Sequence, residues 1–85
     1  MKEFEYVITD KEGIHARPAG LLVKEAAKFA SSIKVSKGDK HGDLKRILSV
    51  MGLGAKCGDT ISISVAGADE EAAAAAVEAF LKAHM

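Results

Sequence analysis

The amino-acid sequence predicts an α+β protein in which helices cover one face of an antiparallel sheet. Two patterns predict it. Apolar and polar residues alternate in the segments expected to be strands, so each strand has one buried and one solvated face. Between these segments lie amphipathic helical patterns, which give the order β-α-β-β-α-β-α. We therefore expect an open-faced β-sandwich, with a four-stranded antiparallel sheet covered on one side by three helices.

The first strand is expected in EFEYVIT, residues 3–9, because apolar side chains recur at every second position, at Phe4, Tyr6 and Ile8. The next apolar residues have helical spacing: Ala19, Leu22, Val23, Ala26, Ala27 and Ala30. Pro18 directly precedes them. Proline is tolerated in the first turn of a helix, where its missing N–H removes no hydrogen bond, so the helix is expected to begin there.

The remaining elements follow from similar patterns. SSIKVSKGDKHG predicts a strand with Ile33 and Val35 inward, a turn at Gly38-Asp39 and a weakly signalled strand ending near Leu44. KRILSVMGLG predicts a brief helix closed by Gly52 or Gly54, and GDTISISVAG is the clearest strand. The last segment, DEEAAAAAVEAFLKAHM, begins with acids and ends with Lys and His, as a helix dipole favours. Its expected buried stripe is Ala73, Val77, Phe80 and Leu81.

Composition excludes several classes of protein. The chain has 85 residues, 12 basic and 12 acidic, so its net charge of zero does not favour nucleic acid or an anionic membrane as a partner. No apolar run approaches the ~20 residues of a membrane span, and the first residues do not resemble a signal peptide. Cys57 is the only cysteine, which favours a reducing compartment. We expect one cytoplasmic domain over residues 1–85, acting as a monomer.

The stretch GIHARPAG, residues 13–20, carries the candidate chemistry. His15 is expected at the N-cap of the first helix, where backbone N–H groups lack partners and the dipole is positive. A phosphoryl group on the His15 ring would face the amides of Ala16 and Arg17, and the Arg17 guanidinium would donate charge-assisted hydrogen bonds to its oxygens. The positive surroundings would keep the imidazole neutral and nucleophilic.

These residues alone leave another interpretation open, since a histidine before a helix is more often an exposed cap or loop residue. Hydrolytic chemistry has no support, because the chain contains neither G-x-S-x-G nor a P-loop. The chain's histidines and its cysteine lack the spacing of a metal site: His15, His41, His84 and Cys57. We therefore expect no metal and no cofactor.

GIHARPAG resembles the active-site signature of HPr, the histidine-containing phosphocarrier family of the bacterial phosphoenolpyruvate:sugar phosphotransferase system. RILSVMGLGAKCGDTISISVAGADEEAA is similar to the second signature of that family with its following strand and helix, so the resemblance covers essentially the whole chain. It implies that His15 accepts a phosphoryl group from phosphorylated enzyme I through Nδ1 and passes it to sugar-specific IIA domains, with Arg17 supporting transfer. Such a protein is a carrier with a covalent phosphohistidine, not a turnover enzyme on its own.

A carrier must dock to several partners. Leu21 falls off the buried stripe of the first helix, and the short helix is apolar almost all round, so both are expected to expose apolar side chains. In the family these two helices form the common partner surface. The resemblance therefore assigns docking to Leu21, Lys24, Ile47, Leu48 and Met51, although Ile47 and Met51 fit the core equally well. Basic residues near this surface would suit acidic partners: Arg17, Lys24, Lys28, Lys45 and Arg46.

The chain departs from the commonest family pattern at Arg46, where most members have a serine that HPr kinase phosphorylates in some Gram-positive bacteria. Arginine cannot accept that phosphoryl group, and it is a poor N-cap. Two alternatives to sugar transport remain. One is a regulatory protein-binding module that transfers no phosphate, which retention of His15 and Arg17 disfavours. The other is a paralogue in a nitrogen-related phosphorelay with different partners.

Overall fold

The computed structural model describes residues 1–14 and 16–84. The described chain forms four strands and three helices in the predicted order, so the predicted fold class is confirmed. The elements are β1 (Lys2–Val7), α1 (Ala16–Ala27), β2 (Ser32–Lys37), β3 (Lys40–Asp43), α2 (Ile47–Gly52), β4 (Thr60–Ala66) and α3 (Glu70–His84).

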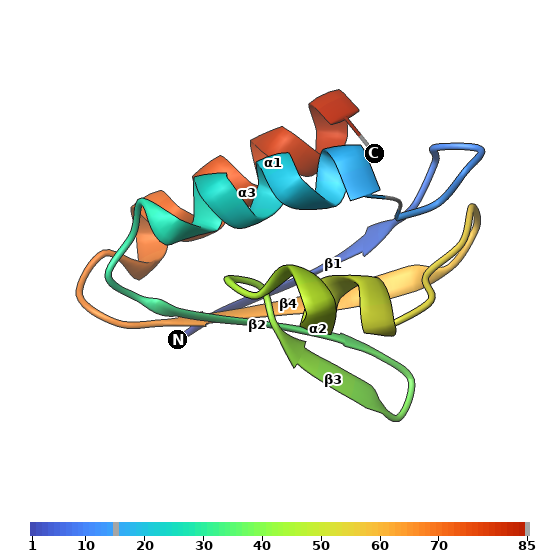
Figure 1. Cartoon of the computed structure of the whole chain (residues 1–85). Coiled ribbons are helices and arrows are strands. Elements are labelled where there is room, and N and C mark those ends of the chain that lie inside the picture. Colours follow the sequence, from blue (N-terminus) through green and yellow to red (C-terminus); the bar gives the residue numbers. More distant parts are fainter. Residues whose placement is uncertain (15, 85) are drawn as a thin grey trace.

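The sheet has the strand order β1-β4-β2-β3, and every neighbouring pair is antiparallel. β2 and β3 form a hairpin in which Lys37 pairs with Lys40, so the predicted turn at Gly38 and Asp39 is confirmed. Gly38 has a φ of 58°, a left-handed conformation that glycine adopts without steric cost. The helices α1 and α3 lie side by side over one face of the sheet (Figure 1). The opposite face is left open.

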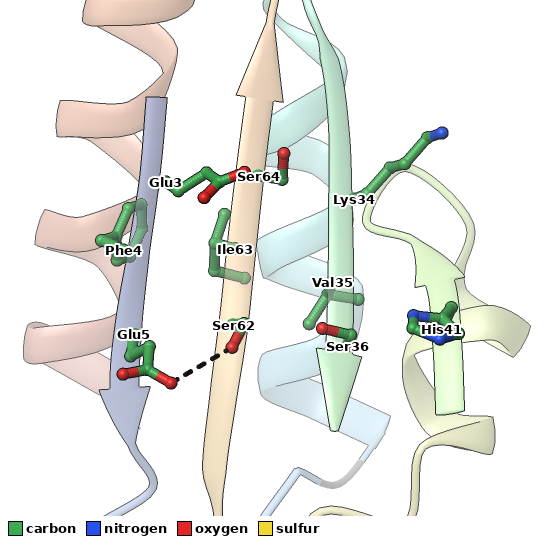
Figure 2. A pocket seen from close by; sticks show the side chains of 10 residues that line it. All are labelled: Glu3, Phe4, Glu5, Lys34, Val35, Ser36, His41, Ser62, Ile63 and Ser64. Atoms are coloured by element: carbon green, nitrogen blue, oxygen red, sulfur yellow. Dashed lines mark hydrogen bonds between the residues drawn. The ribbon is translucent and has the colours of Figure 1, made fainter. Parts of the chain in front are cut away.

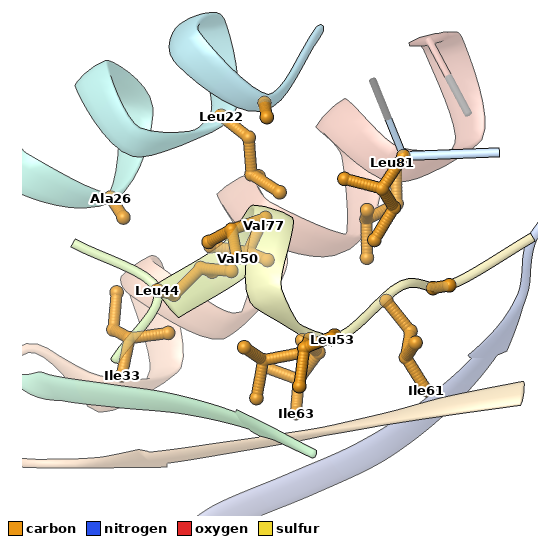
Figure 3. Close-up of a cluster of buried hydrophobic side chains, with 14 of the residues drawn as sticks. Leu22, Ala26, Ile33, Leu44, Val50, Leu53, Ile61, Ile63, Val77 and Leu81 are labelled. Atoms are coloured by element: carbon orange, nitrogen blue, oxygen red, sulfur yellow. The ribbon is translucent and has the colours of Figure 1, made fainter. Parts of the chain in front are cut away.

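The core lies between the sheet and the helices (Figure 3). The alternating residues of the two central strands face inward as predicted, and they pack against buried residues from all three helices. These residues are Ile33 and Val35 of β2; Ile61, Ile63 and Val65 of β4; Ala19, Leu22 and Ala26 of α1; Val50 of α2; and Ala73, Val77 and Leu81 of α3. Alternation therefore identifies the buried face of each central strand correctly.

Two residues of the predicted stripes are exposed, and two more are only partly buried. Ala27 is exposed, and Ala30 is exposed beyond the end of α1, because the helix stops at Ala27 and the chain turns toward β2. Val23 and Phe80 are half-buried and pack against the core, and the Phe80 ring also contacts His84. Of the two candidate glycines, Gly52 is the last residue of α2, and Gly54 takes the left-handed conformation just after it, with a φ of 62°.

Asp69 ties together the two loops at the end of the sheet where α3 begins. Its carboxylate accepts hydrogen bonds from the N–H of Ala30 at 2.8 Å, from the N–H of Ser31 at 2.9 Å, and from the Ser31 hydroxyl. Gly67 lies directly against Ser31, where a Cβ would come within 2.6 Å of Oγ. The donors, chiefly the Ser31 hydroxyl and the Ala30 N–H, lower the pKa of Asp69 below its ordinary value of 3.8.

The lowered pKa predicts a loss of stability in acid. The contribution of Asp69 is complete above its unfolded pKa of 3.8 and is lost as the pH falls through the lower folded pKa. We expect Asp69→Asn to be less stable than the wild type at neutral pH, and to lose less stability on acidification. Urea unfolding at neutral pH and below pH 3.8 measures both effects. Asp39→Asn in the β2–β3 turn controls for loss of a surface charge, and identical pH profiles for Asp69→Asn and wild type would contradict the prediction.

Candidate functional site

The chain that leads into α1 is docked onto a second loop. We call residues 8–14 the entry loop and residues 53–59 the support loop. Three backbone hydrogen bonds join them: Ile8 N–H to the Asp59 carbonyl at 2.9 Å, Gly58 N–H to the Ile8 carbonyl at 2.8 Å, and Ile14 N–H to the Ala55 carbonyl at 3.0 Å. Ile8, Ile14, Leu53 and Ala55 are buried, so apolar contacts accompany these bonds. The residue that precedes position 15 is therefore anchored.

Gly13 allows the two loops to approach closely. Its φ is 69°, and a Cβ at this position would lie 2.5 Å from the Ala55 carbonyl oxygen and 2.7 Å from the Cα of Lys56. Both contacts are with backbone, which cannot move aside as a flexible side chain can. The N–H of Gly13 donates to the carbonyl of Asp10 at 2.9 Å, which closes a tight turn. Glycine is therefore required here by conformation and by space.

The support loop is itself held by Asp59. One oxygen of its carboxylate accepts a hydrogen bond from the Lys56 N–H at 2.8 Å and pairs with the Lys37 ammonium at 3.1 Å. The same ammonium donates to the Gly54 carbonyl at 3.3 Å. The Lys56 N–H, followed by Lys37, lowers the pKa of Asp59 below its ordinary value. β2 is thus connected through Lys37 to both ends of the support loop.

The two residues that start α1 are exposed, whereas the next two, Pro18 and Ala19, are buried. Ala16 and Arg17 occupy the first turn, in which backbone N–H groups have no acceptor within the helix. No acidic residue lies in this turn to oppose the positive end of the dipole. The predicted phosphoryl acceptor, His15, lies outside the described residues. The structure thus places its predicted partners, Ala16 and Arg17, at an exposed helix start.

A hollow of about 190 Å³ lies beside this helix start. It is lined by Asp10 of the entry loop, by Arg17, Pro18 and Leu21 of α1, and by His84 of α3. These residues meet because α1 and α3 run antiparallel, which brings the last turn of α3 next to the first turn of α1 (Figure 1). The sequence alone does not predict that His84 lies near Arg17. Periodicity locates both residues on helices, but it contains no signal for how two helices are aligned.

The predicted docking residues lie on two adjacent helices. Leu48 is 84% exposed and Leu21 is 46% exposed, whereas Val50 on the opposite side of α2 is fully buried. Ile47 and Met51 are also exposed, and the Ile47 side chain lies over Gly20, with Cδ1 3.8 Å from where a Cβ would be. The structure therefore brings four exposed apolar side chains and the exposed Lys24 onto the surface of α1 and α2: Leu21, Lys24, Ile47, Leu48 and Met51. We call these five residues the α1/α2 surface.

Of the five basic residues expected near this surface, two contact other residues of the fold and three are exposed. The Lys28 ammonium pairs with Glu25 at 3.0 Å, and the Lys45 ammonium donates to the Phe29 carbonyl just beyond the end of α1 at 2.7 Å. Arg17, Lys24 and Arg46 are exposed. Arg46 is the N-cap of α2, and within the described chain its side chain makes no capping hydrogen bond, as expected for arginine. Lys45 thus has a structural contact and Lys28 has an acidic partner, whereas Arg17, Lys24 and Arg46 extend into solvent.

A larger hollow, of about 710 Å³, lies over the open face of the sheet (Figure 2). Its outward side chains are polar and come from all four strands, including Glu5, Ser62 and His41. The Ser62 hydroxyl donates to the Glu5 carboxylate at 3.4 Å. None of the predicted site residues that the structure describes lines this hollow. It is a solvated sheet face, and the smaller hollow at the start of α1 is the one that adjoins the motif.

Among the described residues, no three His, Cys, Asp or Glu side chains are grouped so as to hold a metal ion. The Cys57 side chain is exposed on the support loop, with Sγ 3.7 Å from the Thr9 carbonyl oxygen.

The geometry is that of a small open-faced sandwich with an anchored helix start next to an exposed apolar surface. Such an arrangement is expected of a protein that docks to others rather than one that encloses a substrate.

The comparison with known families agrees with this class. A family model described as the PTS HPr component phosphorylation site matches residues 2–83. The chain belongs to this family, the HPr phosphocarriers of the phosphotransferase system.

Individual relatives match nearly the whole chain. It is 48% identical over 83 residues to the phosphocarrier protein HPr of Mycoplasma genitalium, which covers 96% of this chain and 94% of that protein. The crystal structure of HPr-C-His from Thermoanaerobacter tengcongensis is similar to this chain with a TM-score of 0.93. The two are 41% identical, and the match covers 98% of this chain and 93% of that one. A crystal structure of an HPr dimer from the same organism has a TM-score of 0.78 at 41% identity, over 98% and 95%.

The close approach at Gly13 predicts a large cost for any side chain there. Gly13→Ala is expected to destabilise the protein by on the order of 2 kcal/mol, because it combines an unfavourable φ with overlap against backbone. The free energy of unfolding in urea measures this loss.

Gly38→Ala is the matched control, since Gly38 also has a positive φ, at 58°, but nothing lies within 4 Å of its Cβ position. The difference between the two variants isolates the overlap with Ala55 and Lys56. Equal losses of stability would show that the close contact of the two loops contributes nothing.

Proposed function

We propose that this chain carries phosphoryl groups for sugar uptake, accepting them on His15 from phosphorylated enzyme I and donating them to sugar-specific IIA domains. The observation that carries the proposal is that His15 and Arg17 are both present within the residues matched by the phosphorylation-site family model. The anchoring of the entry loop supports it, because a relay between proteins depends on positioning.

We also propose that residues 1–85 act as one monomeric domain in the cytoplasm. Among the described helices, none is long and apolar enough to cross a membrane.

The proposed transfer is a displacement at phosphorus. A lone pair on Nδ1 of neutral His15 forms the new N–P bond, while the bond from phosphorus to its donor atom on enzyme I breaks and returns its electron pair to that atom. The other nitrogen of the His15 ring keeps its proton, and the three phosphoryl oxygens move with phosphorus. Transfer to a IIA domain is the same step with His15 as the donor, so the protein is unchanged after one cycle.

Arg17 and the first amides of α1 have the electrostatic role in this proposal. The Arg17 guanidinium is exposed at the helix start and can donate two hydrogen bonds to oxygens of one phosphoryl group. The N–H groups of Ala16 and Arg17 would add partial positive charge. These groups stabilise the charge on the oxygens during transfer, when phosphorus is bonded only weakly to both nitrogen and donor.

The α1/α2 surface is the proposed docking site for both partners. Its exposed apolar side chains, next to the helix start, support this assignment because such contacts form the centre of protein interfaces. Exposed Lys24, Arg17 and Arg46 suit partners with acidic surfaces. Arg46 also keeps a positive charge where a phosphorylated serine would be negative, so we propose that docking is not switched off through this position.

Phosphorylation by enzyme I tests the function directly. Incubation with enzyme I, Mg²⁺ and phosphoenolpyruvate is expected to add one acid-labile phosphoryl group, detected by intact mass. His15→Ala is expected to fold normally and to remain unmodified, because it has no acceptor nitrogen. If the folded wild type stays unmodified with the enzyme I of its own organism, the regulatory binding module becomes the better interpretation. Phosphorylation by the first enzyme of a nitrogen-related relay, but not by enzyme I of the sugar phosphotransferase system, would favour the nitrogen-related paralogue.

Leu48 tests the docking surface. Leu48→Ala should raise the KM of enzyme I for this protein roughly 5- to 30-fold, since truncating an important interface side chain costs about 1–2 kcal/mol of binding. The stability of the protein should change little, because Leu48 contributes almost nothing to the core. Val7→Ala is the control, as Val7 is 51% exposed but belongs to β1, away from α1 and α2. An unchanged KM, or an equal rise with Val7→Ala, would contradict the assignment.

A further inference from the structure

The hollow beside the start of α1 combines two basic side chains from distant parts of the chain. Arg17 belongs to the first turn of α1, whereas His84 is the last residue of α3. The hollow measures about 190 Å³, several times the ~30 Å³ that one water molecule occupies in the liquid, so a tetrahedral oxyanion fits within it. Pro18 and Leu21 supply its apolar wall.

The imidazole of His84 is oriented by a neighbouring ring. Its centroid lies 4.4 Å from that of Phe80, and the two planes are tilted by 34°. Phe80 is half-buried and packs against the core, which restricts the positions that the His84 ring can adopt. The exposed His84 ring therefore contacts Phe80 and also lines the hollow.

The charges that face the hollow come from three elements. Arg17 of α1 is positive, His84 of α3 becomes positive when protonated, and Asp10 of the entry loop is negative. One carboxylate oxygen of Asp10 accepts the N–H of Glu12 at 2.9 Å, so part of its hydrogen-bonding capacity is used within the entry loop. His84 thus supplies a second donor beside Arg17, from an element that the phosphorylation motif does not include.

We propose that this hollow is an oxyanion subsite in which Arg17 and His84 together hold oxygens of the phosphoryl group carried by His15. The inference rests on the proposed function, and it adds His84 as a further phosphoryl-binding residue. Chain connectivity supports it, because Arg17 and Pro18 follow His15 by only two and three residues. No bond is made or broken by His84, which donates a hydrogen bond and favours the phosphorylated state of the protein.

The equilibrium of phosphorylation measures this contribution. At fixed ratios of phosphoenolpyruvate to pyruvate, with enzyme I and Mg²⁺ present, intact mass gives the phosphorylated fraction. His84→Ala should lower the equilibrium constant for phosphorylation about 2- to 5-fold, the size of effect found for exposed charge pairs. His84→Lys should restore it, because an ammonium also donates to phosphoryl oxygens.

Lys82→Ala is the matched control. Lys82 lies in the same last turn of α3 and is exposed, but it does not line the hollow, so its removal should leave the equilibrium constant unchanged. Equal constants for His84→Ala and wild type would overturn the inference. So would failure of His84→Lys to restore the constant, because His84 would then act only through its contact with Phe80.

A second measurement does not depend on phosphoryl transfer. Inorganic phosphate added to the unmodified protein should shift the NMR signals of the His84 ring and the Arg17 guanidinium, while those of His41, on the open face of the sheet, stay unchanged. If His84 does not respond, or His41 responds equally, the subsite is absent. Should the wild type bind phosphate in this way yet never be phosphorylated by enzyme I, the proposed function fails, while binding of an oxyanion by Arg17 and His84 stands.

Discussion

The backbone pairing between the entry loop and the support loop is the constraint on which the candidate site depends. Loops usually vary in position because few contacts hold them. Here three backbone hydrogen bonds, the close contact at Gly13 and the clamp formed by Asp59 and Lys37 connect the start of α1 to β4 and β2. The exposed residues that begin α1 therefore have a position determined by the sheet, even though they lie on the surface.

In the proposed function, this rigid base allows a small protein to serve several partners. Phosphoryl transfer between proteins requires the acceptor to be exposed and also accurately positioned, and these two demands usually conflict. Ile14, which precedes position 15, is buried, and so are Pro18 and Ala19 in the first turn of α1, so the described residues on both sides of position 15 are fixed to the core. The α1/α2 surface then lies on the same helix that the loops anchor, so a partner that docks there approaches a fixed helix start. In the proposed oxyanion subsite, His84 joins Arg17 from the last turn of α3.

Local sequence patterns predict most of the fold because its elements are short and strongly patterned. Alternation at Ile61, Ile63 and Val65 identifies β4 and its inner face, and Pro18 correctly indicates the first turn of α1. The errors are at Ala27 and Ala30, where a periodic pattern continues past the surface that is available for burial. Contacts between distant segments could not be predicted. The meeting of His84 with Arg17 and the contact of Gly13 with Ala55 depend on how whole elements align, which periodicity does not encode.

Native-state hydrogen exchange tests the central claim that the entry loop is part of the rigid framework. The amides of Ile8, Ile14 and Gly58 donate the three bonds between the loops. We predict that they exchange with a free energy close to that of global unfolding, as expected for the amides of β4. The contrary result is exchange through a local opening several kcal/mol below the global value while β4 stays protected. In that case the start of α1 would be held only after a partner binds.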